Sequence, residues 1–316
     1  MPTIPLLADP TNPNGSHAVT SPGGYEGWHF DASSDDGRLH LVAALHEAWD
    51  RDPLYARRYR WYRRFPTRLR PPLPREFPAV TFLLCEAGKP TVRFAARARP
   101  GDEVRTTDDG RSVRVGASHA ERSSDGSIRL HLRGTDRLRT IAANLTFRPL
   151  IRLGREVTLI DSPAAGLHRW VIVDPLCEVD GEVSIFGGAA SSTPRVISFA
   201  GKGLHDHRYG TRPAPAVQWF SGRVLLDGRA IAFERIGRAR LARLLSATPQ
   251  AAEVLSVPIA DDERASVNIG PISLTHPTIV ASGRNLTLLT YDARIGDESG
   301  VALCRKLRRR RWTPLG

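Results

Sequence analysis

The stretch that decides the fold runs from Val217 to Arg235 and reads VQWFSGRVLLDGRAIAFER. Two runs rich in apolar and aromatic residues, Val217–Leu226 and Ala230–Arg235, flank the pair Asp227-Gly228. Aspartate and glycine supply the left-handed backbone of a tight turn, and strands favour aromatic and β-branched side chains. The stretch therefore predicts a β-hairpin.

Short apolar or alternating runs of the same kind, separated by turn residues, occur along most of the chain. The further predicted strands are Leu39–Leu45, Val80–Cys85, Thr91–Ala96, Ile128–Leu132, Ile141–Phe147, His168–Val173, Glu182–Phe186, Val196–Phe199, Thr278–Ala281, Leu286–Tyr291 and Val301–Cys304. This density of short strands predicts an all-β protein with antiparallel pairing. Such sheets close or pair their edges, and the pattern alone is compatible with a ligand-holding barrel or with a filled sandwich.

The strand series breaks around Arg152–Asp161, which predicts three parts. Residues 1–20 are a flexible leader, residues 21–155 an N-terminal domain and residues 156–316 a C-terminal domain. Two helical insertions are predicted as well. They are Pro53–Phe65 and Arg238–Ser246, the second because Ile236, Leu241, Leu244 and Leu245 share one helical face.

Composition and charge limit the classes of protein that fit. A chain of 316 residues with 41% hydrophobic residues can bury cores, which excludes a disordered chain. The net charge of +12 favours an anionic partner, either a membrane surface or nucleic acid. The arginines are concentrated in two segments, Arg57–Phe65 and Arg305–Trp312. In the first, Tyr59, Trp61 and Tyr62 lie between the arginines. A solvated basic face is the alternative interpretation.

The cysteine pattern and the N-terminal residues give expectations about the compartment. Cys85, Cys177 and Cys304 are odd in number and far apart, which favours neither a disulfide framework nor a zinc knuckle. No signal-peptide pattern and no apolar run of membrane-spanning length is present. The sequence predicts a cytoplasmic protein, with membrane association as an additional role.

Three stretches carry a resemblance to a known family. The first is Gly24–Ala32 (GYEGWHFDA), the second is His168–Val179, with HRW followed by PLCEV, and the third is Gly203–Gly210 (GLHDHRYG). In this order they resemble the superfamily of carotenoid 1,2-hydratases (hydroxyneurosporene synthases) and Diels–Alderases. The resemblance implies two lipocalin-like β-barrel domains in tandem, a large apolar isoprenoid or polyketide substrate, and no metal or organic cofactor.

The chain departs from the pattern of that family at several positions. Gly27 and His29 replace aromatic residues of the opening motif, and Tyr209 replaces the tryptophan after His-Asp-His. The resemblance also implies a tyrosine and a nearby acid on the following strand, where this chain has Phe233 and Glu234. Because phenylalanine cannot donate a proton, this strand lacks the donor that the resemblance to the hydratases implies.

The segment His205-Asp206-His207 is the strongest candidate for chemistry. On a strand its histidines share one face and the aspartate points to the other. Asp206 or His207 is a candidate general acid, and Glu234 is a second candidate acid. Two alternatives stay open: the segment is a hydrogen-bonded structural turn, or it binds a metal whose third ligand the spacing does not reveal.

The predicted ligand contacts are Glu26, Trp28, His205, Tyr209, Trp219 and Phe233. A buried Glu26 must be paired or protonated, and Trp28 is equally a structural residue that closes the barrel floor. The sequence predicts a cofactor-independent enzyme that acts on a large apolar unsaturated metabolite by hydration, cyclisation or isomerisation. A non-catalytic carrier of hydrophobic ligands is the alternative, and nucleic-acid binding is less favoured.

Overall fold

The computed structural model divides the chain into two compact units. It describes residues 14–99, 102, 104–107, 109–136, 138–164, 166–187, 193–212, 219–226, 228–236, 241–262, 266–282 and 286–307. Among these residues the first unit, here the sheet unit, comprises those from Asn14 to Arg212, and the second, the barrel unit, those from Trp219 to Leu307.

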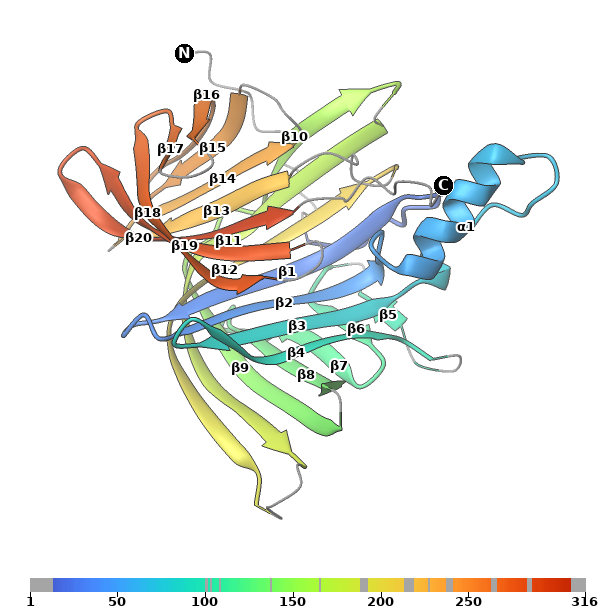
Figure 1. Cartoon of the computed structure of the whole chain (residues 1–316), viewed down its shortest axis with the longest axis horizontal. Helices are drawn as coiled ribbons and strands as arrows, with labels where there is room; N and C mark the ends of the chain where they lie inside the picture. The colour runs from blue at the N-terminus through green and yellow to red at the C-terminus, as the bar shows by residue number, and fades with distance from the viewer. Residues whose placement is uncertain are drawn as a thin grey trace, which may run out of the picture. The chain divides into compact units, whose positions relative to one another are not determined.

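The sheet unit contains one antiparallel sheet of twelve strands (Figure 1). Its strands are β1 (Tyr25–Ser34), β2 (Leu39–Ala48), β3 (Ala79–Glu86), β4 (Lys89–Arg97), β5 (Val104–Thr106), β6 (Ser112–Val115), β7 (Ser118–Arg122), β8 (Ile128–Asp136), β9 (Arg139–Ile151), β10 (Arg155–Ser162), β11 (Gly166–Phe186) and β12 (Arg195–Gly210). The hydrogen-bonded order is β4-β3-β2-β1-β12-β11-β9-β8-β7-β6-β5, and β10 pairs with β11. The sheet is a half-barrel among the described residues.

The core of the sheet unit lies on one face of this curved sheet. Alternate residues of nearly every strand meet there, including Trp28 and Phe30 of β1, Phe147 of β9 and Phe199 of β12. Alternation within a strand places the next residues on the opposite face. A side chain's position in β1 or β12 therefore decides which side of the sheet it faces.

The unit boundary lies at residues 214 and 215, downstream of the predicted break around 152–161. The reason is the pairing of β11, which joins β12 on one side and both β10 and β9 on the other. Each strand after the predicted break up to Gly210 is thus hydrogen-bonded into the same sheet as β1. The two predicted strands His168–Val173 and Glu182–Phe186 are parts of one long strand.

The barrel unit is a closed antiparallel barrel of eight strands. They are β13 (Trp219–Leu225), β14 (Ala230–Ile236), β15 (Leu241–Ala247), β16 (Ala252–Asp262), β17 (Ser266–Ile269), β18 (Ile272–Ser282), β19 (Leu286–Ile295) and β20 (Glu298–Leu307). The predicted hairpin is confirmed, with Gly222 opposite Phe233. A Cβ on Gly222 would lie 2.6 Å from the Phe233 ring and 2.7 Å from the Cys304 sulfur, so glycine permits dense packing there.

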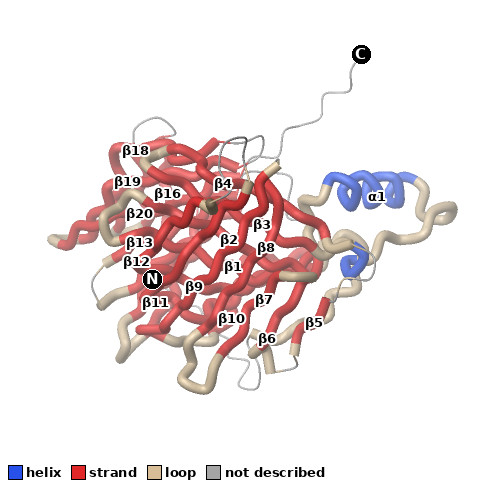
Figure 2. Tube along the Cα trace, turned by 90° about the horizontal axis from the view of Figure 1, so that it is seen from below, coloured by secondary structure: helices blue, strands red, loops and turns tan. Residues whose placement is uncertain are grey.

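One predicted helix is confirmed. Helix α1 (Pro53–Arg64) begins at Asp52, whose carboxylate accepts hydrogen bonds from the amides of Leu54 and Tyr55, and Pro53 occupies the first turn. A short 3₁₀ helix, η1 (Pro74–Glu76), follows. Figure 2 shows α1 outside the sheet. Within the described part of the chain, no helix has the length and apolar character needed to cross a membrane.

The second predicted helix, Arg238–Ser246, is wrong. Residues 237–240 lie outside the described residues, and Leu241–Ala247 form strand β15 between β14 and β16. Ala242 and Leu244 face the barrel core, while Leu241 is exposed, as strand alternation requires. The apolar spacing fits a helix and a strand alike, and hydrogen bonding to both neighbours decides for the strand.

Candidate functional site

The three motif stretches lie on three adjacent strands of the sheet unit. Strand β12, which carries His-Asp-His, pairs with β1 on one side and with β11 on the other. The register places Trp28 opposite His207 and Glu26 opposite Tyr209. Residues far apart in sequence thus meet at the same end of one strand pair.

The strand separates the members of His-Asp-His, as the alternation predicts. His207 stacks on Trp28 with ring centroids 4.4 Å apart, and His205 stacks on Phe30 at 4.3 Å, so both face the core. Asp206 points to the other face, where Trp170 Nε1 donates to its carboxylate at 3.1 Å and Arg208 pairs with it at 2.7 Å. Asp206 and His207 therefore do not share one side of the sheet.

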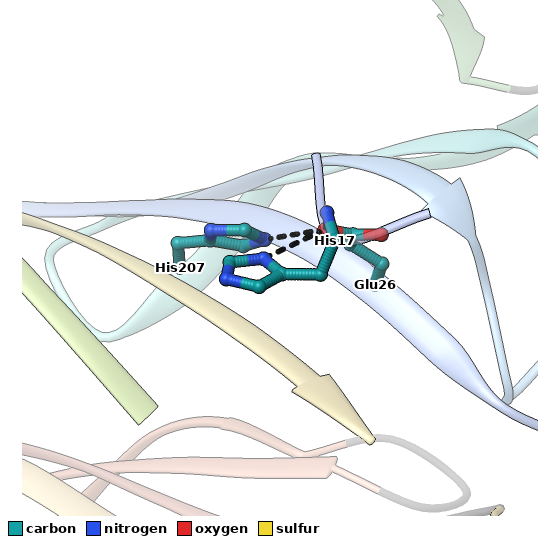
Figure 3. A group of neighbouring side chains, drawn as sticks. All are labelled: His17, Glu26 and His207. Atoms are coloured by element: carbon teal, nitrogen blue, oxygen red, sulfur yellow. Dashed lines mark hydrogen bonds and ion pairs between the residues drawn. The ribbon is translucent and has the colours of Figure 1, made fainter. Parts of the chain in front are cut away.

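The centre of the site is a cluster of His17, Glu26 and His207 (Figure 3). The Oε1 atom of Glu26 lies 3.1 Å from His207 Nε2 and 3.3 Å from His17 Nδ1, and it accepts the His17 backbone amide at 2.7 Å. The side chains of Glu26 and His207 are 2% and 0% exposed, whereas that of His17 is 20% exposed. His17 is thus the member of the cluster that solvent reaches.

Glu26 is held as a carboxylate. Burial raises its pKa, but hydrogen bonds from His17 and His207 and the charge of a protonated His207 outweigh burial and lower the pKa of Glu26 from 4.5 to about 2. A buried acid of this kind is a fixed negative charge at neutral pH. The requirement that a buried Glu26 be paired is therefore met by two imidazoles.

His17 was not predicted, because it lies in the stretch interpreted as a flexible leader. Residues 14–20 instead pack on the sheet unit: the Trp28 indole donates to the Asn14 carbonyl at 2.8 Å, and His17 stacks on Tyr209 with ring centroids 3.8 Å apart. Residues 1–13 lie outside the described residues. Proline- and asparagine-rich sequence carries no periodic signal, so only the tertiary contacts reveal the role of His17.

Tyr209 extends the cluster toward β10. Its hydroxyl donates to Glu156 at 2.5 Å, and Arg169 pairs with the same carboxylate at 2.9 Å. Burial and the adjacent Glu156 charge raise the pKa of Tyr209 well above its usual value. Tyr209 is therefore a neutral hydrogen-bonding group whose ring covers His17.

The cluster also has the donor types of a divalent-metal site. The ligand atoms of His17, Glu26 and His207 all lie within 4.8 Å of one another, and two imidazoles with a carboxylate suit zinc. Of the His-Asp-His segment only His207 belongs to this group, because His205 Nδ1 contacts the His29 carbonyl at 3.1 Å instead. His168 and His40 also lie outside the group and contact Tyr25 and Ser33. The short contacts to one Glu26 oxygen are accounted for by hydrogen bonds alone.

The remaining predicted site residues belong to the barrel unit. The Trp219 indole donates to Glu234, and both side chains are buried. Phe233 lies in the barrel core with its ring centroid 5.3 Å from that of Phe220. The sequence placed these three residues in one site with Asp206 and His207, whereas the chain holds them in a different unit.

A second polar cluster in the sheet unit was not predicted. Asp174 is fully buried on β11 and pairs with Arg122 at 2.5 Å and with Arg152 at 3.6 Å. Burial raises the pKa of Asp174, although the Arg122 charge opposes that rise. The three side chains line a polar pocket of about 330 Å³. The register of β11 shifts on both sides of Asp174, and no sequence pattern marks such a shift.

Fold and site together define an all-β protein of the lipocalin-like kind, built from a half-barrel sheet and a closed barrel. No family model matches the chain. It is similar to the hydroxyneurosporene dehydrogenase of Chlorobaculum tepidum, with 27% identity over 214 residues, which cover 66% of this chain and 55% of that protein. The chain thus spans about half the length of that curated relative.

Solved structures share the fold. The AttH candidate of Nitrosomonas europaea matches with a TM-score of 0.62 and 14% identity, covering 98% of this chain and all of the other. CghA matches with a TM-score of 0.52 and 12% identity, covering 98% of this chain and 94% of its own. The structure of CghA with Sch210972 matches with a TM-score of 0.50 and 13% identity, covering 97% of this chain and 99% of its own. These matches confirm the lipocalin-like fold, and the curated relative separately supports the resemblance to a carotenoid-related family.

Proposed function

We propose that the chain is a cofactor-independent enzyme that transforms a large apolar unsaturated metabolite by proton transfer at the cluster of His17, Glu26 and His207. The observation that carries the proposal is the contact of Glu26 with His207, formed where two motif strands pair. The curated relative is named for hydroxyneurosporene, which favours an isoprenoid substrate, and CghA was solved with Sch210972.

Each member of the cluster has a distinct part in the proposed chemistry. Imidazole is the usual proton donor near neutral pH, so His17 and His207 are the candidate general acids. Glu26 is ionised and positions both imidazoles. Its charge, with the rings of Trp28 and Tyr209, would stabilise a carbocation formed when a proton adds to an alkene carbon.

The fate of that cation distinguishes the reactions. Addition of water and loss of one proton gives an alcohol, which is hydration. Loss of a proton from a neighbouring carbon gives a rearranged alkene, and attack by a second double bond gives a ring. All three reactions begin with the same proton transfer and return the proton, so no cofactor is needed to balance them.

Asp206 receives a different role from the predicted one. Its carboxylate is engaged by Arg208 and by the Trp170 indole, and it lies on the face opposite His207. We propose that Asp206 fixes β12 against β11 and thereby positions His207. Glu234, bound by Trp219 within the barrel unit, has no part in the proposed proton transfer.

The test is incubation of the purified protein with an acyclic carotenoid in detergent micelles, followed by liquid chromatography and mass spectrometry. Hydration adds the mass of one water, whereas isomerisation or cyclisation changes retention at constant mass. Replacing His207 with Gln is expected to lower turnover about 100-fold or more, the usual contribution of a general acid. His276→Gln is the matched control, because His276 forms an exposed pair with Asp292 in the barrel unit.

A carrier is the second candidate function, because a closed barrel of eight strands is of the size that can hold one small ligand. If the protein is a carrier, the wild type and the His207→Gln and His276→Gln variants would all bind the carotenoid, and none of them would convert it to a product. Turnover that is unaffected by His207→Gln and by His17→Gln would contradict the proposed site.

A further inference from the structure

We propose that helix α1 and the arginine-rich segment after it form a docking surface for an anionic lipid membrane. Residues 53–78 contain eight arginines and a single glutamate, Glu76, which gives this segment +7 of the chain's net charge of +12. Lipid surfaces with acidic headgroups attract such clusters. Membrane binding at this surface does not depend on the proposed chemistry.

The helix presents its arginines on the face that turns away from the protein. Tyr55, the one buried residue of α1, shares a face with Tyr59 and Tyr62 at a spacing of four and three residues. Arg57, Arg60 and Arg64 lie on the opposite face and are exposed. Figures 1 and 2 show α1 standing off the strands, which leaves that face open.

An apolar group accompanies the charges. Trp61 shares the exposed face with the arginines and is 52% exposed, and Leu69 after the helix is 40% exposed. Both line a groove of about 770 Å³ together with Arg57, Arg58 and Arg70. A tryptophan among arginines on one helical face is typical of helices that lie in the membrane interface.

The same geometry favours lipid over nucleic acid. Binding of single strands by stacking needs several accessible rings, but Tyr59 and Tyr62 lie on the inward face and are only partly exposed. Trp61 and Leu69 supply apolar contact, which a lipid interface accepts and a phosphate backbone does not. The second basic cluster, Arg305–Trp312, lies mostly outside the described residues and carries no part of the inference.

The experiment is flotation of the full chain with two kinds of vesicle. One contains phosphatidylcholine alone, and the other also contains roughly 30–40% phosphatidylglycerol, which imitates an anionic membrane leaflet. Binding is expected only with the anionic vesicles, together with a blue shift of tryptophan fluorescence that Trp61→Phe removes. The triple variant Arg57→Gln, Arg60→Gln and Arg64→Gln is expected to weaken binding about 100-fold, from about fivefold per charge.

The matched control removes three exposed arginines elsewhere in the sheet unit, namely Arg93, Arg129 and Arg133. It changes net charge equally and is expected to leave most of the binding intact. Three results would overturn the proposal. The first is equal binding to neutral and anionic vesicles, and the second is an equal loss of binding in both triple variants. The third is an anionic oligonucleotide that competes with the vesicles, together with a fluorescence shift that does not depend on Trp61.

Discussion

The Glu26 carboxylate offers a sharp test of the electrostatics of the site. Its pKa of about 2 in the folded chain, against 4.5 for the free side chain, is a difference of about 2.5 pH units. At about 1.36 kcal/mol per unit, the ionised form contributes about 3 kcal/mol to folding at neutral pH. Glu26→Gln, which mimics the protonated acid, is therefore expected to lower the free energy of unfolding by about 3 kcal/mol at pH 7.

The pH dependence has a definite sign. Because the folded pKa is depressed, the contribution of Glu26 is complete above pH 4.5 and is lost as the pH falls toward about 2. Urea unfolding at pH 7 and at intervals down to pH 3, followed by tryptophan fluorescence, should show wild type and variant converging. A difference that stays constant over that range, or one under about 1 kcal/mol at pH 7, would refute the reasoning.

Glu47 provides the matched control in the same region. Burial and the Glu26 charge raise the pKa of Glu47, although a hydrogen bond from Ser16 opposes this. An acid with a raised pKa destabilises the fold once it is ionised. Glu47→Gln removes the same charge as Glu26→Gln, yet it is expected to leave stability at pH 7 unchanged or slightly higher.

Three further predictions concern the framework of the site. Gly181→Ala should lower the free energy of unfolding by about 3 kcal/mol in thermal unfolding, since its Cβ would lie 2.1 Å from a backbone oxygen of β9. Gly37→Ala is the control and should lower it by about 1 kcal/mol, because the space around Gly37 is open. Asp52→Ala removes the cap of α1 and the partner of Arg97, so urea unfolding should show a loss of about 2 kcal/mol, and Asp52→Asn should recover the capping part. Trp28→Phe loses the indole hydrogen bond to the segment of residues 14–20, so limited proteolysis within that segment should become faster.

The sequence predicted the class of fold because strand alternation and turn residues are local signals. The hairpin around Asp227-Gly228 and the helix after Asp52 have such signals and formed as expected. The segment Leu241–Ala247 was interpreted as a helix because its spacing suits both structures, and its neighbours in the barrel decided the outcome. The unit boundary depended on long-range pairing of β11, which no local pattern encodes.

The candidate site was predictable only in part, for the same reason. Alternation placed His205 and His207 on one face and Asp206 on the other, so the structure keeps His207 near Glu26 and Trp28 while Asp206 faces away. His17 carries no sequence signal and comes to Glu26 through the packing of residues 14–20. Glu234, Phe233 and Trp219 were predicted to belong to the site because they are acidic or aromatic, but they lie in the barrel unit.

Product analysis with an acyclic carotenoid tests the central claim most directly. Wild type should convert the polyene to a hydrated or rearranged product, while His207→Gln and Glu26→Gln, each shown to be folded, should retain bound polyene with at least about 100-fold slower conversion. If both variants convert it as fast as wild type, or if no polyene of this class binds the wild-type chain, chemistry at the paired Glu26 and His207 is contradicted.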